Sequence, residues 1–337
     1  MKAMVMREFG PPDVLRLEDV PTPAPGPGEV LVHVHAVSIN QTLDVVVRAG
    51  RYARKPAMPH VLGVDPSGVV VAVGSDATNR KVGDRVFCRT AVGVDAHGVN
   101  LLLGVNVWGG YAEYVAVPAS ATHLIPEGVD FATATIVARH APLAFTQLRD
   151  KAQVKPGEWV LVMGAAGGLG SAAVQVAKAL DARVIAAAGS DERVAFAMAL
   201  GADAGVNYRA ADLTSEVRRI TEGKGVNVVI ENIGDPDLFS KAFASLGRGG
   251  RLITAGGHGG GMVPLDVKHL YLNYITIIGH PGENRSAVDE SLAAAAEGRI
   301  KVKVDRVMPL SQAAQAHALV EGRAGLGKIL LDPTRLN

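Results

Sequence analysis

Hydrophobic and polar residues follow two different patterns along the chain. Up to about residue 125, hydrophobic residues fall in short valine-rich runs, such as Val30–Val37 and Gly68–Val73, which predict β-strands. The stretch Pro21–Gly28, rich in proline and glycine, predicts an ordered surface loop between two such runs. No amphipathic pattern of helix length occurs before about residue 130. We therefore expect the N-terminal part to be a β-rich unit.

From Trp159 onward, strand-length apolar runs alternate five times with helix-length segments. The runs are WVLVM, RVIAAA, AGVNY, VNVVIEN and RLITAG, and YITIIG at 274–279 can add a sixth strand. Strands that are apolar throughout are buried on both faces. Regular alternation with helices indicates a parallel sheet covered by helices on both sides. The pattern predicts an α/β fold class with a doubly wound domain after the β-rich unit.

The segments after about residue 285 do not continue this alternation. They are a helix-like stretch, SAVDESLAAAAEG, an extended stretch, KVKVDRVMPL, a second helix-like stretch, SQAAQAHALVEG, and a short strand-like run, GKILL. We expect them to return to the N-terminal unit, which would make that unit discontinuous in sequence.

Composition and charge exclude several classes of protein. With 337 residues, 48% of them hydrophobic and 20% charged, the chain is ordinary for a globular protein and long enough for two domains. Its 34 basic and 33 acidic residues give a net charge of +1, which favours neither a nucleic-acid partner nor a membrane surface. The single cysteine, Cys88, excludes a disulfide framework. No targeting segment is evident, and glycines interrupt the uncharged run Trp159–Ala177, so we expect a cytoplasmic protein without a membrane span.

A glycine-rich turn, Ala165-x-Gly167-x-x-Gly170, lies between the first buried strand and the helix after it. The N-terminus of a helix offers unpaired N–H groups and the positive end of a dipole, both suited to a phosphate. Gly167 lets the backbone approach a pyrophosphate, and Gly170 lets the helix pack closely on the strand. A tight turn without a ligand is the alternative. Within five alternating units we favour a dinucleotide site.

The end of the second predicted strand indicates which nicotinamide cofactor binds. An NAD site usually places Asp or Glu there to accept hydrogen bonds from the ribose, whereas this strand ends at Gly189 and Ser190. Ser190 can donate to a 2′-phosphate, and Arg193 can pair with it. Alternatively, Ser190 caps the next helix, Arg193 is a solvated charge, and Asp191 holds the ribose of NAD. We favour NADPH (NADP+).

Several longer strings of the sequence are typical of one enzyme superfamily. They are PHVLGVDPSGVVVAVG, KVGDRV, GGYAEYVAVP, VKPGEWVLVMGAAGGLGSAAVQVAKAL, GSDERVAFAMALGADAGVNYR, VIENIG and VDRVMPLSQAAQAHALVEGRAGLGKILL. Through them the chain resembles the medium-chain dehydrogenase/reductases, especially the zinc-independent branch of quinone oxidoreductases and acryloyl-CoA-type enoyl reductases. The resemblance implies a GroES-like β-rich catalytic domain of residues 1–125 and 266–337 and a doubly wound Rossmann domain of residues 126–265. It also implies a small-molecule substrate and a homodimer in which the sixth strand pairs across the two chains.

The resemblance further implies roles for individual residues. On the cofactor side these are Ala165, Gly167, Gly168, Leu169 and Gly170 at the pyrophosphate, Gly189, Ser190, Arg193 and Tyr208 at the 2′-phosphate, and Thr146, Asn232 and Gly256 elsewhere along the cofactor. On the substrate side, Asn40 lines the nicotinamide and Tyr52 faces the substrate.

The positions at which zinc-dependent relatives bind their metal carry other residues here. Those relatives have a Cys near position 40, Gly-His-Glu near 63–65 and a Cys or Asp near 140, where this chain has Asn40, Gly63-Val64-Asp65 and His140. Zinc prefers thiolate and imidazole ligands, so we expect no zinc. An improvised set of His60, Asp65 and His140 is the alternative, although Asp65 is explained more simply by bonds to backbone groups.

Reduction of a conjugated acceptor is the easier chemistry when no metal stabilises an alkoxide. Hydride adds to an enone, an enoyl thioester or a quinone, and the charge that develops on oxygen needs only hydrogen-bond donors. Tyr52, Asn40 and backbone amides are candidate donors. His140 is a candidate substrate-side acid or a core histidine, and Arg139 either meets an acidic or CoA-linked substrate or is a surface charge.

The segment NQTLDVVVR departs from the family pattern, because it is one residue longer between Asn40 and Arg48 and has valines where an aromatic is common. For Asp44 within it, the structural alternative to a role in the site is a bond to Arg48. The leading hypothesis is an NADPH-dependent reductase of activated double bonds or quinones. The alternatives are a metal-free alcohol or carbonyl dehydrogenase and a non-catalytic NADPH-binding protein.

Overall fold

The structure, a computed structural model, describes residues 1–322 and 325–335 and divides into two compact units. One unit consists of Met1–Arg139 with Val302–Asn337, and the other of His140–Lys301. The N-terminal part and the end of the chain therefore share a unit. The boundaries expected at 125/126 and 265/266 lie elsewhere, at 139/140 and 301/302.

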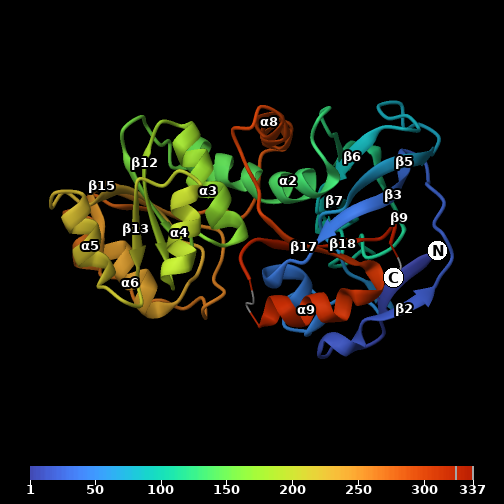
Figure 1. The fold of residues 1–337 in the computed structure, drawn as a ribbon, viewed down its shortest axis with the longest axis horizontal. Helices are drawn as coiled ribbons and strands as arrows, with labels where there is room; N and C mark the ends of the chain where they lie inside the picture. Colours follow the sequence, from blue (N-terminus) through green and yellow to red (C-terminus); the bar gives the residue numbers. More distant parts are fainter. Residues whose placement is uncertain (323–324, 336–337) are drawn as a thin grey trace. The chain divides into compact units, whose positions relative to one another are not determined.

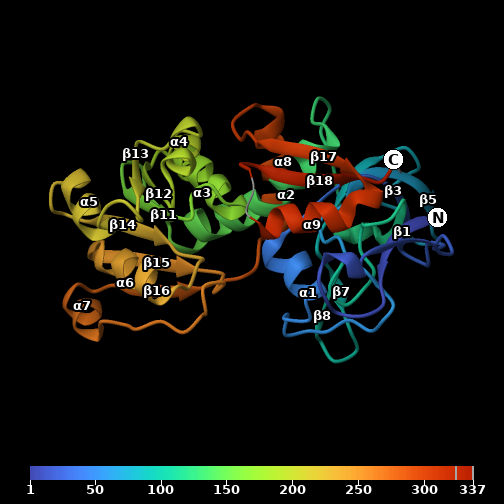
Figure 2. The same ribbon diagram turned by 60° about the horizontal axis from the view of Figure 1, so that its bottom comes forward.

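The second unit is built on a parallel six-stranded sheet in the order β13-β12-β11-β14-β15-β16 (Figure 2). Its strands are β11 (Trp159–Met163), β12 (Arg183–Ala188), β13 (Ala204–Asn207), β14 (Val226–Ile230), β15 (Leu246–Thr254) and β16 (Thr276–Gly279). All six predicted strands are confirmed. Val160, Leu161 and Val162 of the central strand are fully buried, which explains the uninterrupted apolar run.

Four helices connect the first five strands of this sheet. They are α3 (Gly168–Ala179), α4 (Asp191–Ala199), α5 (Leu213–Ile220) and α6 (Pro236–Ala244). Right-handed crossovers place α3 and α4 on one face and α5 and α6 on the other, and Figure 1 shows α3 and α4 together beside the strands. In the part of the chain that the structure describes, no helix is both long and apolar enough to cross a membrane. The cytoplasmic location stays a prediction.

The second unit also contains α7 (Val267–Leu272), α8 (Arg285–Ala296) and the π-helical turn η4 (Thr146–Lys151). Helix α8 is tied to this turn, because the Asn284 N–H donates to Thr146 Oγ1 at 3.0 Å and Arg149 pairs with Glu290. The expectation that everything after residue 285 returns to the first unit therefore does not hold for α8.

Within its described residues, the first unit contains three sheets, whose pairings are mostly antiparallel. The largest has the order β10-β6-β5-β3-β18-β17 with β9 also on β3, and the others are β2-β1-β4 and β7-β8. The bounds are β1 (Lys2–Met6), β2 (Arg16–Asp19), β3 (Glu29–Ser38), β4 (His60–Val61), β5 (Ser67–Val73), β6 (Arg85–Cys88), β7 (Ala91–Val94), β8 (Asn100–Leu102), β9 (Tyr114–Pro118), β10 (Thr122–Leu124), β17 (Val304–Pro309) and β18 (Lys328–Asp332). Short 3₁₀ turns are η1 (Pro12–Val14), η3 (Ala119–Ala121) and η5 (Leu310–Gln312), and α9 (Ala313–Glu321) follows the last of them.

Strand β18 joins the end of the chain to β3 in the middle of the largest sheet. It runs antiparallel to β3, with Leu330 opposite Ser38 and Leu331 opposite Val37. Helix α2 (Phe131–Phe145) covers these two strands, since Ile136 packs with Ala36 of β3 and Leu330 of β18. The predicted strands of this unit and the return of β17, β18 and α9 to it are confirmed.

The segment after Asn40 forms a π-helical turn, η2 (Gln41–Val45), which leads into the short helix α1 (Val46–Arg48). The Val45 N–H donates to the Asn40 carbonyl five residues earlier, at 3.2 Å. A π turn holds one more residue than an α turn. This geometry fits the extra residue expected from the resemblance, which itself stays a prediction.

Asp44 and Arg48 do not bond each other, contrary to the expectation from the sequence. The Asp44 carboxylate accepts from the N–H groups of Asn40 and Gly63, at 2.8 and 3.1 Å. The buried Arg48 guanidinium instead pairs with Glu321 of α9 at 2.7 Å. The two ends of this short segment are thus held by different parts of the first unit.

Burial, assisted by the charge of Asp65, raises the pKa of Asp44 to about 7. Because this pKa lies above its unfolded value, the folded state holds a proton between about pH 4 and 7 that the unfolded state has lost. The free energy of unfolding should therefore fall as pH rises through this range, by roughly 3–4 kcal/mol for this group. Urea unfolding of the wild type and Asp44→Asn at pH 5 and pH 7.5 measures this, and the drop should be smaller in the variant. Asp19→Asn, an exposed aspartate on β2, is the control, and an equal drop in Asp44→Asn would contradict the prediction.

Candidate active site

The glycine-rich turn connects β11 to α3 in the second unit. Gly167 is the N-cap of α3 and provides no side-chain cap, and no group among the described residues accepts from the N–H groups of Gly168, Leu169 and Gly170. A Cβ on Gly170 would lie 2.2 Å from the Gly164 carbonyl oxygen, so only glycine allows this close packing. Ala165, in the first glycine place of the pattern, is fully buried. The turn therefore presents free backbone donors suited to an anion.

His140 lies against this turn. A Cβ on Gly168 would be 2.5 Å from His140 Nε2, so the imidazole occupies the space beside the glycine. The sequence suggested His140 as a substrate-side acid, and the structure places it at the start of α3, where the N–H groups are free. Its catalytic role stays a prediction.

Basic and hydroxyl side chains gather where β12 and β13 end. A Cβ on Gly189 would lie 3.1 Å from Tyr208 Oη and 3.3 Å from Arg209 Nε, so both side chains flank that glycine. Ser190 caps α4 by accepting from the Arg193 N–H at 3.4 Å. Arg209 was not among the predicted residues, although its place directly after Tyr208 at the end of a predicted strand was a signal that could have identified it.

Asp191 is the residue that could favour NAD, and its carboxylate already interacts with other groups of the protein. The side-chain amide of Asn207 donates to its carboxylate at 2.8 Å. Asp191 also lies in the first turn of α4, where a negative charge complements the helix dipole. Both interactions indicate a structural role for the Asp191 side chain.

The remaining predicted cofactor residues lie after β14, after β15 and in η4. Asn232 Oδ1 accepts from the Ala255 N–H at 2.7 Å, and a Cβ on Gly256 would be 2.7 Å from the Asn232 carbonyl oxygen, so these two positions adjoin. Thr146 is fully buried, and its hydroxyl bonds the Pro142 carbonyl and the Asn284 N–H. Roles at the cofactor stay predictions for all three residues.

Glu231, which was not predicted, lies between β14 and Asn232 and is almost completely buried. Its carboxylate accepts from the N–H groups of Ile233 and Gly234, at 2.9 and 3.1 Å. Burial raises the pKa of Glu231, although these two bonds oppose the shift. The residue shapes the turn after β14.

In the first unit, Asn40 is the centre of a buried polar cluster. Its amide nitrogen donates to Asp65 at 2.9 Å and to Ser38 Oγ at 3.1 Å, and its amide oxygen accepts from Lys328 Nζ at 3.1 Å. Asp65 also accepts from the backbone N–H and the hydroxyl of Ser38. Asn40 is only 3% exposed and Asp65 is fully buried, so the side chain of Asn40 links the Lys328 ammonium to a buried carboxylate. Its place beside the nicotinamide stays a prediction.

This cluster does not fit zinc. It offers a carboxylate and an amide but no thiolate or imidazole, and a lysine ammonium already bonds the amide oxygen. In the described residues, no three His, Cys, Asp or Glu side chains are grouped to hold a metal. Tyr52 lies partly buried against the apolar core of the same unit, and its role toward a substrate stays a prediction.

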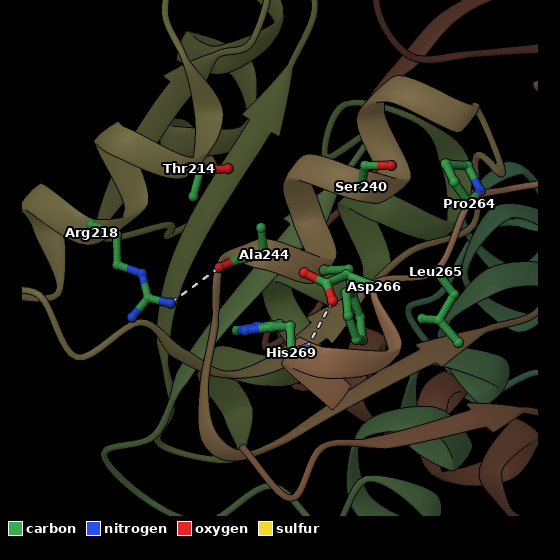
Figure 3. A pocket seen from close by; sticks show the side chains of 9 residues that line it. Thr214, Arg218, Ser240, Ala244, Pro264, Leu265, Asp266 and His269 are labelled. Carbon is green, nitrogen blue, oxygen red and sulfur yellow. Dashed lines mark hydrogen bonds between the residues drawn. The ribbon is translucent and has the colours of Figure 1, made fainter. Parts of the chain in front are cut away.

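A separate cavity of about 560 Å³ lies in the second unit, between α5, α6 and the start of α7 (Figure 3). Its lining residues are Thr214, Arg218, Ser240, Phe243, Ala244, Pro264, Leu265, Asp266 and His269. Arg218 donates to the Ala244 carbonyl at 3.1 Å, and Asp266 accepts from the His269 N–H at 2.9 Å. Because both charged groups bond the backbone of their own unit, we assign the cavity no functional role.

Comparisons with known proteins agree with this arrangement. A family model described as "Zinc-binding dehydrogenase" matches residues 168–297, and one described as "Alcohol dehydrogenase GroES-like domain" matches residues 26–127. Quinone oxidoreductase of Homo sapiens is 32% identical, over 98% of this chain and 97% of that protein. The predicted GroES-like and Rossmann parts are therefore both confirmed.

Two solved structures are similar over almost their whole length. One is an NAD-dependent alcohol dehydrogenase, with 37% identity and a TM-score of 0.89 over 98% of this chain and 99% of that one. The other is quinone oxidoreductase of Escherichia coli complexed with NADPH, with 28% identity and a TM-score of 0.83 over 99% and 100%. The chain therefore belongs to the medium-chain dehydrogenase/reductase superfamily, is similar to its quinone oxidoreductases, and is an oxidoreductase enzyme.

Proposed function

We propose that this enzyme transfers hydride from NADPH to an activated C=C bond or a quinone without a metal ion. The observation that carries the proposal is the free N-terminus of α3 at the glycine turn, together with the basic residues that follow β12 and β13. The first suits a pyrophosphate and the second a 2′-phosphate. NADPH would supply the hydride, and the protein's residues would bind and orient it.

The choice of NADPH over NADH rests on charge. Arg209 and Tyr208 flank Gly189, and Arg193 lies in the first turn of α4, whereas the carboxylate of Asp191 is bonded to Asn207. A phosphate dianion is favoured by guanidinium groups and disfavoured by a free carboxylate. The quinone oxidoreductase of Escherichia coli was solved with NADPH, which supports the same choice.

The absence of a zinc ligand set from the Asn40 cluster favours an acceptor whose charge is stabilised by hydrogen bonds. When hydride adds to a conjugated acceptor, the negative charge moves to a carbonyl oxygen and needs donors more than a Lewis acid. We propose Tyr52 or water as the source of the final proton. The similarity to an alcohol dehydrogenase favours a second candidate, metal-free alcohol or carbonyl oxidoreduction.

A panel of acceptors separates the two candidates. With NADPH, we expect turnover of small enones, enoyl thioesters or quinones, measured by loss of absorbance at the nicotinamide, and little turnover of simple aldehydes. Metal analysis of the same purified protein should find less than one zinc per chain. Turnover of aldehydes alone would favour the second candidate, and one tightly bound zinc per chain would overturn the metal-free proposal.

The cofactor proposal predicts that the double variant Arg193→Gln/Arg209→Gln raises the KM for NADPH by roughly 10- to 100-fold, since each charge-assisted bond to a phosphate contributes on the order of 1.5 kcal/mol. The KM for NADH should change little. Arg219→Gln removes an exposed guanidinium of the same unit that pairs with Glu216 and serves as the control. A double variant that weakens NADH and NADPH equally would contradict the assignment.

We also propose a homodimer formed through β16, the edge strand of the parallel sheet. The residues around this edge are apolar and exposed, including Leu272, Tyr274 and Ile277, at 53%, 67% and 39%. An uncovered apolar edge strand is unusual in a monomer, and a two-fold axis can pair it with its own copy. Pairing would continue the sheet from one chain into the other.

Ile277→Lys should therefore convert the dimer to a monomer, as measured by light scattering after gel filtration. Val307→Lys is the matched control, because Val307 has nearly the same exposure, 40%, on the edge strand β17 of the first unit. A mass unchanged by Ile277→Lys, or a monomeric wild type, would contradict the prediction.

A further inference from the structure

The order of the parallel strands indicates where each half of the proposed cofactor would lie in the second unit. The groups suited to a 2′-phosphate follow β12 and β13, and the N–H groups suited to a pyrophosphate follow β11, the next strand of the sheet. The two halves of a dinucleotide extend in opposite directions from its pyrophosphate. The nicotinamide half would therefore lie on the other side of β11, over the ends of β14 and β15.

The turn after β14 lies between the glycine turn and the loop after β15. On one side, a Cβ on Gly164 of the glycine turn would be 3.7 Å from Ile233 Cδ1. On the other side, the Gly259 N–H donates to the Ile233 carbonyl at 2.6 Å. The Gly261 N–H likewise donates to the Gly234 carbonyl at 3.1 Å. The conformation of this turn therefore determines how the loop after β15 lies relative to the glycine turn.

The buried carboxylate of Glu231 holds this turn. Its Oε1 accepts from the N–H groups of Ile233 and Gly234 at 2.9 and 3.2 Å, and its Oε2 accepts from Gly234 at 3.1 Å. Gly234 has a φ of +68°, and a Cβ there would lie 2.6 Å from Gly257 Cα. In the part of the chain that the structure describes, the groups that bond the Glu231 carboxylate are backbone N–H groups. The carboxylate therefore stabilises a conformation that suits glycine alone.

A neutral amide of the same length would hold the turn less well. Both oxygens of Glu231 face N–H donors, whereas glutamine has one oxygen and an NH2 group, which is itself a donor. A glutamine would place that NH2 group against a backbone N–H or turn away from it, and burial makes the lost bond costly. The negative charge of Glu231 therefore serves the geometry of the turn.

We propose that Glu231 is a positioning residue for the nicotinamide half of the cofactor. Its carboxylate holds the turn after β14 and the loop after β15 in the arrangement that accepts this half. Asn232, whose side chain accepts from the Ala255 N–H, is part of the same arrangement. The inference rests on the proposed function, from which it takes the cofactor site. The adenosine half binds on the far side of β11, at β12 and β13, so its binding is independent of this carboxylate.

The test compares NADPH with its adenosine half, 2′,5′-ADP, by calorimetric titration of the full-length protein. Glu231→Gln should bind NADPH roughly 10-fold more weakly than the wild type, because the turn loses a charge-assisted hydrogen bond. The same variant should bind 2′,5′-ADP as tightly as the wild type. Glu231→Asp keeps the charge on a shorter side chain and should weaken NADPH alone, by less, which keeps the test decisive if Glu231→Gln does not fold. Glu222→Gln, an exposed glutamate of the same unit, should change neither affinity.

The difference between the two ligands decides the inference. If the variants weaken NADPH and 2′,5′-ADP equally, or weaken neither, Glu231 is not a positioning residue and the inference is overturned. These measurements need no turnover, so they separate the inference from the proposed function. A wild type that reduces no acceptor, together with a selective loss of NADPH binding in Glu231→Gln, would overturn the proposed activity and leave the inference standing. Turnover of an acceptor with NADPH, together with unchanged NADPH binding in both variants, would do the reverse.

Discussion

The antiparallel pairing of β18 with β3 is the contact on which the first unit depends. It joins residues almost 300 positions apart in sequence, and it places Lys328 next to the residues that follow β3. Without that ammonium, the carboxylates of Asp65 and Asp44 would share a buried space with no positive charge bonded to the cluster, at a cost that burial makes large. The end of the chain is therefore part of the site as well as of the sheet. The same pairing provides the surface on which α2 packs.

In the second unit, by contrast, backbone groups form most of the candidate cofactor site. Its parallel strands end at one edge, and the turn after β11 leaves the first N–H groups of α3 unpaired. Glycines there are required by contact distances, since a Cβ on Gly170 would meet the Gly164 carbonyl. Side chains contribute at the next turn, where Tyr208 and Arg209 flank Gly189. The first unit thus fixes charges through buried side chains, whereas the second presents donors from its backbone.

Much of this architecture could be predicted from the sequence, because it depends on local patterns. The six strands of the parallel sheet are apolar runs of the right length. The spacing of the glycine turn follows from the close backbone packing that it must allow. What could not be predicted depends on contacts between distant segments. Arg209 becomes significant only when β12 and β13 lie side by side, and α8 remains with the second unit because Asn284 and Glu290 bond residues of η4. The alternative of an Asp44–Arg48 bond was wrong partly for the same reason, since one of the two partners of Asp44, Gly63, lies nineteen residues away.

The π turn at Gln41–Val45 has a consequence for how this segment of the chain can vary. An added residue within a helical segment rotates the side chains before it by about 100° relative to those after it. Here the rotation is confined between two fixed points, the Asn40 amide in its cluster and the Arg48 guanidinium against α9. The segment can therefore present a new set of side chains while its ends stay anchored. A residue inserted or removed at this place would therefore change the surface of the turn while its two anchored ends keep their contacts.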